Sequence, residues 1–270
     1  MNRDNPSLSG ISKAFLEARR QGRALAQFPG ALPSDLDTAY AIQTASIKDW
    51  GTPIAGWKIG LVPRSFRAQF GAERLAGPVF ADRVERCPDG GHATARFVEG
   101  GFGALEAEFI FELQRDPTEL QRVIGDEELG ACIGALHVGV ELAGSPLKTI
   151  NELGPAAIVS DFGNNSGLIV GPSIPGWRQR ALETLRARML IDGSVAGHGS
   201  AADVPEGPLS AVRFLVGSCR DRGFRLPPGT LVSTGAVTGV HEVRSGAQAV
   251  IDFGEFGKIS INVETKGDAA

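Results

Sequence analysis

The hydrophobic pattern of the first third of the chain predicts helices. Three segments carry helical spacing and end at, or just before, a glycine or Pro-Gly: Ile11–Phe28, Ser34–Gly51 and Ser65–Phe70. The second begins with an S-x-x-D cap formed by Ser34 and Asp37. We therefore expect a small helical region before the character of the sequence changes.

From about Pro78 onward, short β-like runs replace the helical pattern, and turns containing many of the chain's 36 glycines separate them. Asp192-Gly193 predicts a type I′ hairpin turn between two of these runs. Helices are expected only at about Ile150–Val159 and Leu209–Arg222. The expected strands are Pro78–Val84, Leu105–Leu113, Leu136–Leu142, Gly167–Val170, Leu185–Ile191, Ser194–Gly197, Thr230–Thr234, Gln248–Phe253 and Lys258–Val263.

The order of these elements predicts an α+β fold. It is not a regular alternation of strand and helix, which disfavours a Rossmann-like fold or an eight-fold α/β barrel. Many short strands with few helices indicate a mixed, largely antiparallel β-roll or sandwich. We place the boundary near residue 75, with a helical N-terminal region over 1–75 and a β-rich domain over 76–270.

Composition narrows the class of protein. Hydrophobic residues make up 42% of the 270, enough for a full core, and the net charge of −4 gives no general attraction to nucleic acid or an anionic membrane. We expect no signal peptide and no transmembrane segment. Three well-separated cysteines disfavour a disulfide framework, so we expect a cytoplasmic protein with buried thiols: Cys87, Cys132 and Cys219.

Glu106 and Glu108 lie in the most informative segment, LEAEFIF. With a period of two, Leu105, Ala107 and Phe109 share one strand face, and the two glutamates share the other. Burying both in the ionised form would be unfavourable without a cation. A solvated strand face, however, explains a lone E-x-E better than a metal site does.

Glu141 closes a second, otherwise apolar run. It shares a face with His137 and Gly139, and the glycine suggests a close approach of the backbone there. A surface acid at a strand end explains Glu141 equally well by itself. If the three carboxylates converged, they would form a hard-oxygen site suited to Mg²⁺ or Mn²⁺. The four histidines show no zinc-ligand spacing, so carboxylates would have to hold any metal.

Lys58 stands between Trp57 and Ile59 in a glycine-flanked, apolar stretch. Burial there would lower the pKa of the lysine and make it a usable proton donor or an anchor for a carboxylate. A lysine that extends to solvent from the end of a strand or helix explains the residues equally well.

The sequence resembles the fumarylacetoacetate hydrolase superfamily, in its 2-oxopent-4-enoate hydratase and 4-oxalocrotonate decarboxylase branch. The resemblance covers nearly the whole chain, and it is the ordered set of motifs that is specific. The matching segments are Ala39–Gln43, Gly56–Leu61, Gly77–Asp82, Leu105–Phe109, Gly139–Glu141, Ser160-Asp161 with the glycine-rich segment to Gly171, and Val232–Gly235.

The resemblance implies a helical N-terminal region followed by a β-roll catalytic domain. It implies that Glu106, Glu108 and Glu141 converge to ligate a divalent metal, Mg²⁺ or Mn²⁺, and it favours a functional role for Lys58. It also implies a homo-oligomer.

Asp82 matches an acidic position of the family, which suggests a catalytic role. By its own sequence context, next to Arg83, Asp82 is better explained as an arginine-paired turn residue. One departure lies nearby, because relatives carry an acidic and an aromatic residue just before the glycine at Gly77. This chain has Arg74-Leu75-Ala76 there, which affects the choice of substrate.

Ser166, Thr234 and Gly235 are the candidate substrate-binding residues. Ser166 lies in a loop that matches a family segment written D-N-x-S/A, although Phe162 replaces the expected asparagine. A turn between a helix and a strand explains this loop equally well. Thr234-Gly235 ends an apolar run, where its backbone N–H groups would face a ligand.

The resemblance implies a metal-dependent hydratase that adds water to a 2-hydroxydienoate, the enol form of a small 2-oxo acid, giving a 4-hydroxy-2-oxo acid. A decarboxylase of the 4-oxalocrotonate type is an alternative, because loss of CO₂ uses the same enolate. A hydrolase of a 1,3-diketone is less favoured, because no His/Glu pair is recognisable near the motifs. The alternative from another class is a non-catalytic organic-acid-binding protein.

Overall fold

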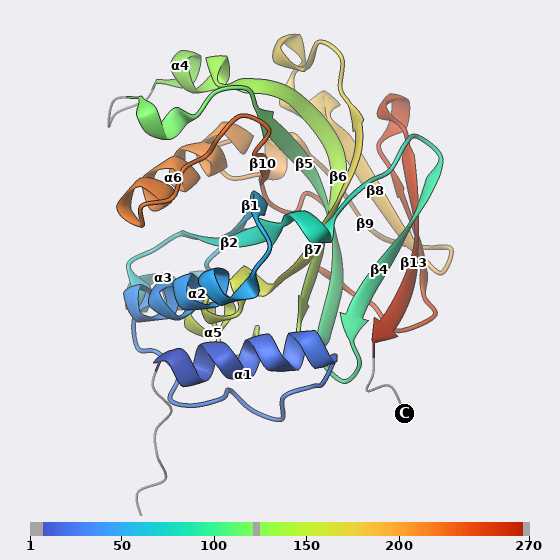
Figure 1. The fold of residues 1–270 in the computed structure, drawn as a ribbon. Helices are drawn as coiled ribbons and strands as arrows, with labels where there is room; N and C mark the ends of the chain where they lie inside the picture. The colour runs from blue at the N-terminus through green and yellow to red at the C-terminus, as the bar shows by residue number, and fades with distance from the viewer. Residues whose placement is uncertain (1–7, 121–124, 267–270) are drawn as a thin grey trace, which may run out of the picture.

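The computed structural model describes residues 8–120 and 125–266. Within these ranges, six α-helices lie on one side of the β-strands (Figure 1). In Figure 1, α1, α2, α3 and α5 form one group, and α4 and α6 lie at the other end of the same side. β1 and β2 run between these groups. The helices are α1 (Leu8–Gln21), α2 (Leu36–Trp50), α3 (Arg64–Phe70), α4 (Asp126–Ala131), α5 (Pro155–Ser160) and α6 (Pro208–Asp221).

The strands form two sheets. The larger has the order β2-β1-β10-β5-β6-β7-β3, with β11 also pairing with β5, and the smaller has the order β4-β13-β12-β8-β9. The strands are β1 (Ile54–Leu61), β2 (Arg74–Phe80), β3 (Val84–Arg86), β4 (Gly91–Val98), β5 (Phe102–Leu113), β6 (Ile133–Ser145), β7 (Asn165–Ser173), β8 (Arg186–Ile191), β9 (Ser194–Ser200), β10 (Leu231–Ser233), β11 (His241–Glu242), β12 (Gln248–Asp252) and β13 (Lys258–Lys266).

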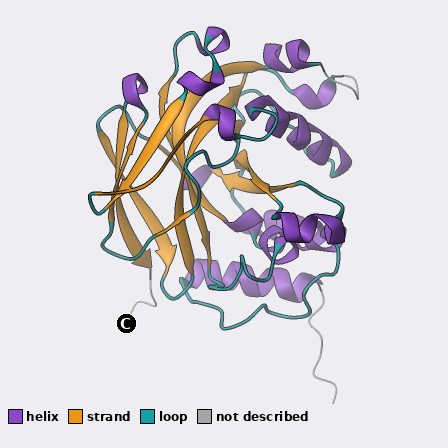
Figure 2. Ribbon diagram, turned by 180° about the vertical axis from the view of Figure 1, so that it is seen from behind, coloured by secondary structure: helices purple, strands orange, loops and turns teal. Residues whose placement is uncertain are grey.

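The sheets confirm the predicted α+β class and the mixed, largely antiparallel pairing. Among the described strands, parallel pairing is found only between β1 and β10, β3 and β7, and β4 and β13. The two sheets pack face to face, for example where Phe109 of β5 contacts Phe253, with ring centroids 6.0 Å apart. Figure 2 shows the curled strands gathered on one side and the larger helices on the other.

The ends of the helices differ from the sequence prediction for local reasons. α1 stops at Gln21 because Gly22 adopts a positive φ of 70°, well before the predicted end. The N-cap of α2 is Asp35, whose carboxylate accepts a hydrogen bond of 2.7 Å from the Thr38 N–H, so the predicted Ser34/Asp37 cap is wrong. The helix expected from Ile150 begins only at Pro155, the first residue of α5.

Most of the predicted strands are present, with several changes. The run predicted over 78–84 is divided between β2 and β3 by a short 3₁₀ turn at Ala81–Arg83. The pattern also missed β1, which lies in the region predicted to be helical, and the short β11. It missed β4 as well, although alternate residues of β4, from Ala93 to Phe97, are buried. Asp192 and Gly193 both have positive φ and join β8 to β9, as the predicted type I′ hairpin requires.

The larger sheet combines distant parts of the chain. β1, before residue 75, pairs in parallel with β10 near the C-terminal end, and β10 pairs with β5. The predicted division at residue 75 falls within β2. All three cysteines are buried free thiols, as predicted. Within the described ranges, no helix is long and apolar enough to cross a bilayer.

A buried ion pair attaches α1 to the loop that follows α5. Arg19 Nε and Nη2 donate hydrogen bonds of 2.6 and 2.9 Å to the Asp161 carboxylate, which also accepts one of 2.6 Å from Ser145 Oγ. The Asp161 side chain is fully buried. Because an unpaired buried charge is far less stable than a paired one, this contact fixes the start of β7 relative to the N-terminal helices.

We expect Arg19→Met to destabilise the fold by about 3–5 kcal/mol, because the substitution leaves Asp161 buried without its cation. Urea unfolding at neutral pH measures the change. Lys13→Met, which removes an exposed cation from the same helix, is the matched control and should change stability by less than about 0.5 kcal/mol. Equal stability of the two variants would contradict this account of Asp161.

Candidate active site

Three glutamates converge on one face of the larger sheet. β5 and β6 pair in a register that places Glu106 opposite Glu141 and Glu108 opposite Gly139. One carboxylate oxygen from each of Glu106, Glu108 and Glu141 lies within 4.8 Å of the others. All three residues are buried. The alternatives of a solvated strand face for the first two and a surface acid for Glu141 are therefore wrong.

The opposite face of β5 explains why the glutamates point where they do. Leu105, Ala107 and Phe109 are completely buried in the core between the two sheets. The period of two then directs Glu106 and Glu108 away from that core. Because helices and loops cover this second face as well, neither side of the strand is open to solvent over this segment.

Gly139 has a packing role. A Cβ atom at this position would clash with Ile110 Cδ1 and with the backbone carbonyl oxygen of Ile169. The close approach predicted from the glycine is therefore made by the neighbouring strands β5 and β7.

Hydrogen bonds hold the glutamates in place but leave two oxygens without partners. Glu108 Oε2 accepts hydrogen bonds from Ser233 Oγ at 2.5 Å and from the Gly235 N–H at 2.9 Å. Glu141 Oε1 accepts one from Asn165 Nδ2 at 3.0 Å. Glu108 Oε1 and Glu141 Oε2 are buried and have no hydrogen-bond partner. Such oxygens are the donors that a hard divalent cation takes as ligands.

Lys58 supplies one positive charge to this cluster. It lies in β1 opposite Ser233 of β10, it is 5% exposed, and its Nζ is 3.2 Å from Glu141 Oε1. Burial lowers the pKa of Lys58, but Glu141, Glu106 and Glu108 together raise it above its ordinary value. The prediction that burial gives Lys58 a lowered pKa is therefore wrong for the metal-free site, because the carboxylates outweigh desolvation.

One ammonium group cannot neutralise three carboxylates. Burial and the charge of Glu141 raise the pKa of Glu106 to about 7, although Lys58 opposes the shift. Burial and the charges of Glu141 and Glu106 likewise raise the pKa of Glu108. A divalent cation would remove this repulsion, and three carboxylates form an oxygen-only ligand set typical of Mg²⁺ or Mn²⁺. The residues therefore fit a divalent metal.

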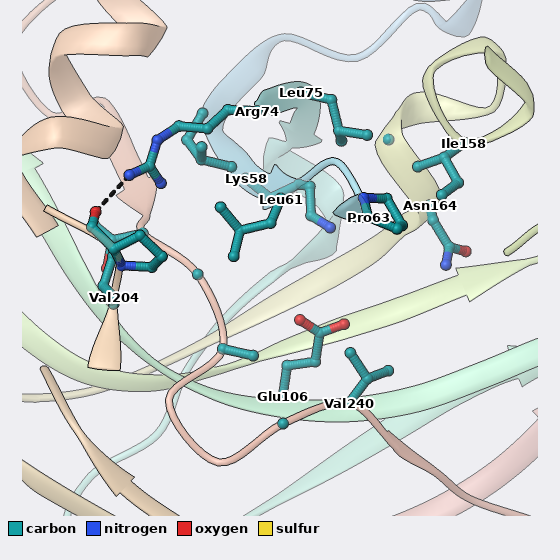
Figure 3. A pocket seen from close by; sticks show the side chains of 18 of the residues that line it. Lys58, Leu61, Pro63, Arg74, Leu75, Glu106, Ile158, Asn164, Val204 and Val240 are labelled. Atoms are coloured by element: carbon teal, nitrogen blue, oxygen red, sulfur yellow. Dashed lines mark hydrogen bonds between the residues drawn. The ribbon is translucent and has the colours of Figure 1, made fainter. Parts of the chain in front are cut away.

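The cluster borders a cavity of about 400 Å³. Lys58 and Glu106 line one part of it, and Thr234 and Gly235 lie beside them. Figure 3 shows Glu106 between Arg74 on one side and Asn164 on the other. Apolar side chains make up much of the remaining wall: Leu61, Leu75, Ile158, Val204 and Val240.

The predicted substrate-binding residues separate into two groups. Thr234 and Gly235 line the cavity, but Thr234 Oγ1 donates to the carbonyl oxygen of Phe109, and the Gly235 N–H donates to Glu108. Ser166 lines a different, smaller cavity, where its Oγ accepts a hydrogen bond of 3.4 Å from Arg19. The structure therefore does not bring Ser166 together with the other two.

Asp82 lies outside the cavity. It is exposed in the 3₁₀ turn after β2, and its carboxylate is 3.6 Å from Arg83 Nε. The structure thus gives Asp82 the environment of an arginine-paired turn residue and does not place it beside Lys58 or the glutamates.

Sequence reasoning missed three residues near the site. Ser233 and Asn165 hold Glu108 and Glu141, and Arg74 lines the cavity wall. A serine in an apolar strand was a usable signal for Ser233, and Arg74 stood out as a departure from the family pattern. Nothing in the sequence distinguished Asn165 from Asn164, because only the fold shows which of them reaches Glu141.

Known lyases are similar to this chain in sequence, although no family model matches it. The chain is 26% identical over 254 residues to a 4-oxalocrotonate decarboxylase of Pseudomonas putida, covering 93% of this chain and 92% of that protein. It is 25% identical over 243 residues to a 2-keto-4-pentenoate hydratase of Burkholderia vietnamiensis, covering 87% and 88%.

Solved structures share the fold. The 4-oxalocrotonate decarboxylase from Pseudomonas putida G7, complexed with magnesium and adipate, has a TM-score of 0.75 and 23% identity over 95% of this chain and 97% of that one. The fumarylpyruvate hydrolase from Pseudomonas aeruginosa, in complex with Mn²⁺ and pyruvate, has a TM-score of 0.55 and 16% identity over 80% and 91%. The chain is thus similar over most of its length to 4-oxalocrotonate decarboxylases and 2-keto-4-pentenoate hydratases, the branch of the fumarylacetoacetate hydrolase superfamily that its motifs resemble, and it shares the fold of the solved structures.

Proposed function

We propose that this protein is a divalent-metal-dependent lyase acting on a small 2-oxo-enoate or its 2-hydroxydienoate tautomer. The observation that carries the proposal is the buried cluster of three glutamates with two unpartnered oxygens beside a cavity. Glu106, Glu108 and Glu141 would hold the cation, which when bound supplies Lewis-acid stabilisation of the enolate. The two relatives described above, a 4-oxalocrotonate decarboxylase and a 2-keto-4-pentenoate hydratase, are both lyases.

Lys58 would orient the substrate and hold a proton. Its Nζ lines the cavity and remains charged between carboxylates, so it can bind the 1-carboxylate or an oxygen that gains negative charge. Ser233 and Asn165 would fix Glu108 and Glu141, because each donates a hydrogen bond to a ligand carboxylate. Thr234 and Gly235 would shape the cavity wall beside Glu106.

Hydration is the outcome predicted from the sequence. Protonation of the enolate at a distal carbon gives an α,β-unsaturated ketone, and addition of water at C4 gives the 4-hydroxy-2-oxo acid. A group near C4 must then activate water. Asp82 is exposed beside Arg83 and does not line the cavity, so it is not placed to supply this group. Leu75, in the segment where the family resemblance leads us to expect an acid, forms an apolar part of the wall.

Decarboxylation is the second candidate. It needs the same enolate stabilisation but no water-activating group at C4, and an apolar side chain at Leu75 is compatible with that requirement. Hydrolysis of a 1,3-diketone is disfavoured, because no histidine is among the described residues that line this cavity. His137 does face Glu112 at 3.3 Å, but this pair lies outside the cavity lining.

We expect Mg²⁺-dependent turnover of 2-hydroxypenta-2,4-dienoate or of 4-oxalocrotonate, and loss of that turnover in EDTA. Loss of dienol absorbance follows the reaction, and product analysis for a 4-hydroxy-2-oxo acid or CO₂ identifies its type. Binding of both compounds without turnover of either would support the organic-acid-binding alternative and overturn the proposal.

Glu106→Gln should weaken Mn²⁺ or Mg²⁺ binding about 10-fold or more, because an amide replaces one of three charged ligands. Isothermal titration at pH 7.5 measures the Kd. Glu112→Gln is the matched control on the same strand, since the carboxylate of Glu112 pairs with Arg86 at 2.9 Å and lies away from the cluster. Unchanged affinity in the Glu106 variant would remove this residue from the ligand set.

The metal-free protein should become less stable as the pH rises from about 4.5 to about 7. In this window the folded protein keeps a proton on Glu106, whose pKa is about 7, whereas the unfolded chain has released it near 4.5. Urea midpoints in EDTA at pH 5 and pH 8 measure the loss.

Two comparisons isolate the contribution of the Glu106 carboxyl group to the pH dependence of stability. Glu106→Gln should reduce the difference between the two midpoints, and Mg²⁺ should stabilise the native-sequence protein more at pH 8 than at pH 5. An identical pH dependence in the variant and the native sequence would show that Glu106 does not titrate in this range.

A further inference from the structure

Arg74 places a second cation in the wall of the cavity. It is the first residue of β2, pairs with Leu61 of β1, and is 8% exposed. In Figure 3 its guanidinium lies beside Val204 at one side of the cavity, whereas Asn164 and Ile158 lie at the other side. Lys58 and Arg74 are the two cationic side chains among the described lining residues.

The guanidinium of Arg74 is only partly satisfied. Its Nη2 donates hydrogen bonds to the carbonyl oxygen of Pro205 at 2.5 Å and to Ser210 Oγ at 2.7 Å. Nε and Nη1 have no hydrogen-bond partner in the part of the chain that the structure describes. Each of these nitrogens can donate a single charge-assisted hydrogen bond to a carboxylate, whereas either bidentate arrangement of a guanidinium would need Nη2, which is already engaged.

No carboxylate of the described chain neutralises Arg74. Burial lowers the pKa of Arg74, and the charges of Glu206 and Glu73 oppose this shift without forming an ion pair with it. Arginine nevertheless stays charged. Asp203 also lines the cavity, but it is exposed and accepts hydrogen bonds from Ser200. A buried cation whose hydrogen-bond acceptors in the described chain are neutral oxygens favours an incoming anion.

At the glutamate end of the cavity, the proposed function already balances the negative charges of the three carboxylates. Lys58 pairs with Glu141, and a divalent cation would neutralise the two remaining carboxylates. The positive charge of Arg74 therefore remains available for a further anionic group of the ligand. Apolar side chains of Leu61, Leu75 and Val204 line the same cavity and suit a carbon chain.

We infer that Arg74 is a specificity-determining residue that binds a second carboxylate at the far end of the substrate, so that the substrate is a dicarboxylic 2-oxo acid. The inference rests on the proposed function, because the first carboxylate and the 2-oxo group are taken to lie at the glutamate cluster.

A pair of unreactive ligands tests the inference. 2-Oxohexanedioate and 2-oxohexanoate have the same 2-oxo acid end and chain length, and only the first carries a distal carboxylate. Isothermal titration into the Mg²⁺-loaded protein should give a Kd for the dicarboxylate about 10-fold or more lower, the value of one charge-assisted contact.

Variants separate the charge of Arg74 from its structural contacts. Arg74→Gln should weaken binding of 2-oxohexanedioate about 10-fold and leave 2-oxohexanoate within about twofold. Arg74→Lys should recover part of the preference. Ser210→Ala is the matched control, because it removes a contact of Arg74 while keeping the guanidinium, and it should retain the preference for the dicarboxylate.

The outcomes distinguish this inference from the proposed function. Equal binding of both ligands by the native sequence, or equal weakening of both in Arg74→Gln, would overturn the role of Arg74 and leave the metal-dependent lyase intact. Absence of Mg²⁺-dependent binding of either ligand would overturn the proposed function and the inference together.

Discussion

Mutual repulsion among three buried carboxylates is the constraint on which this site depends. Glu106, Glu108 and Glu141 approach closely on one sheet face, where solvent cannot screen them. Lys58 offsets one charge, and two carboxylate oxygens still lack a partner. Such an arrangement is unfavourable in the metal-free protein, and raised pKa values of Glu106 and Glu108 are the direct consequence. A divalent cation would turn the same arrangement into a ligand set.

The fold keeps the carboxylates together through contacts between distant segments. Ser233 of β10 holds Glu108, and Asn165 at the start of β7 holds Glu141. The loop before Asn165 is in turn attached to α1 by the buried pair of Arg19 and Asp161. The N-terminal helices therefore contribute to the geometry of the site without lining its cluster, because they fix the segment that positions one of its ligands.

In the proposed function, the two ends of the cavity have different roles. The glutamate end would carry chemistry that hydration and decarboxylation share, since both pass through an enolate of a 2-oxo acid. The other wall carries Arg74 and Leu75, in the segment where the sequence departs from the motif of the family that it resembles. Substrate choice would then depend on this wall, because a cation and an apolar side chain there select the length and charge of the ligand.

The sequence by itself determined the α+β class and the shared face of Glu106 and Glu108, because both follow from periodicity along short segments. It could not determine that Glu141 lies opposite Glu106, because that register depends on pairing between separate strands. It also gave the wrong direction for the pKa of Lys58, since the carboxylates that raise it come from β5 and β6. Only the tertiary structure decided which polar residues reach the cavity, because direction in space depends on packing between elements remote in sequence.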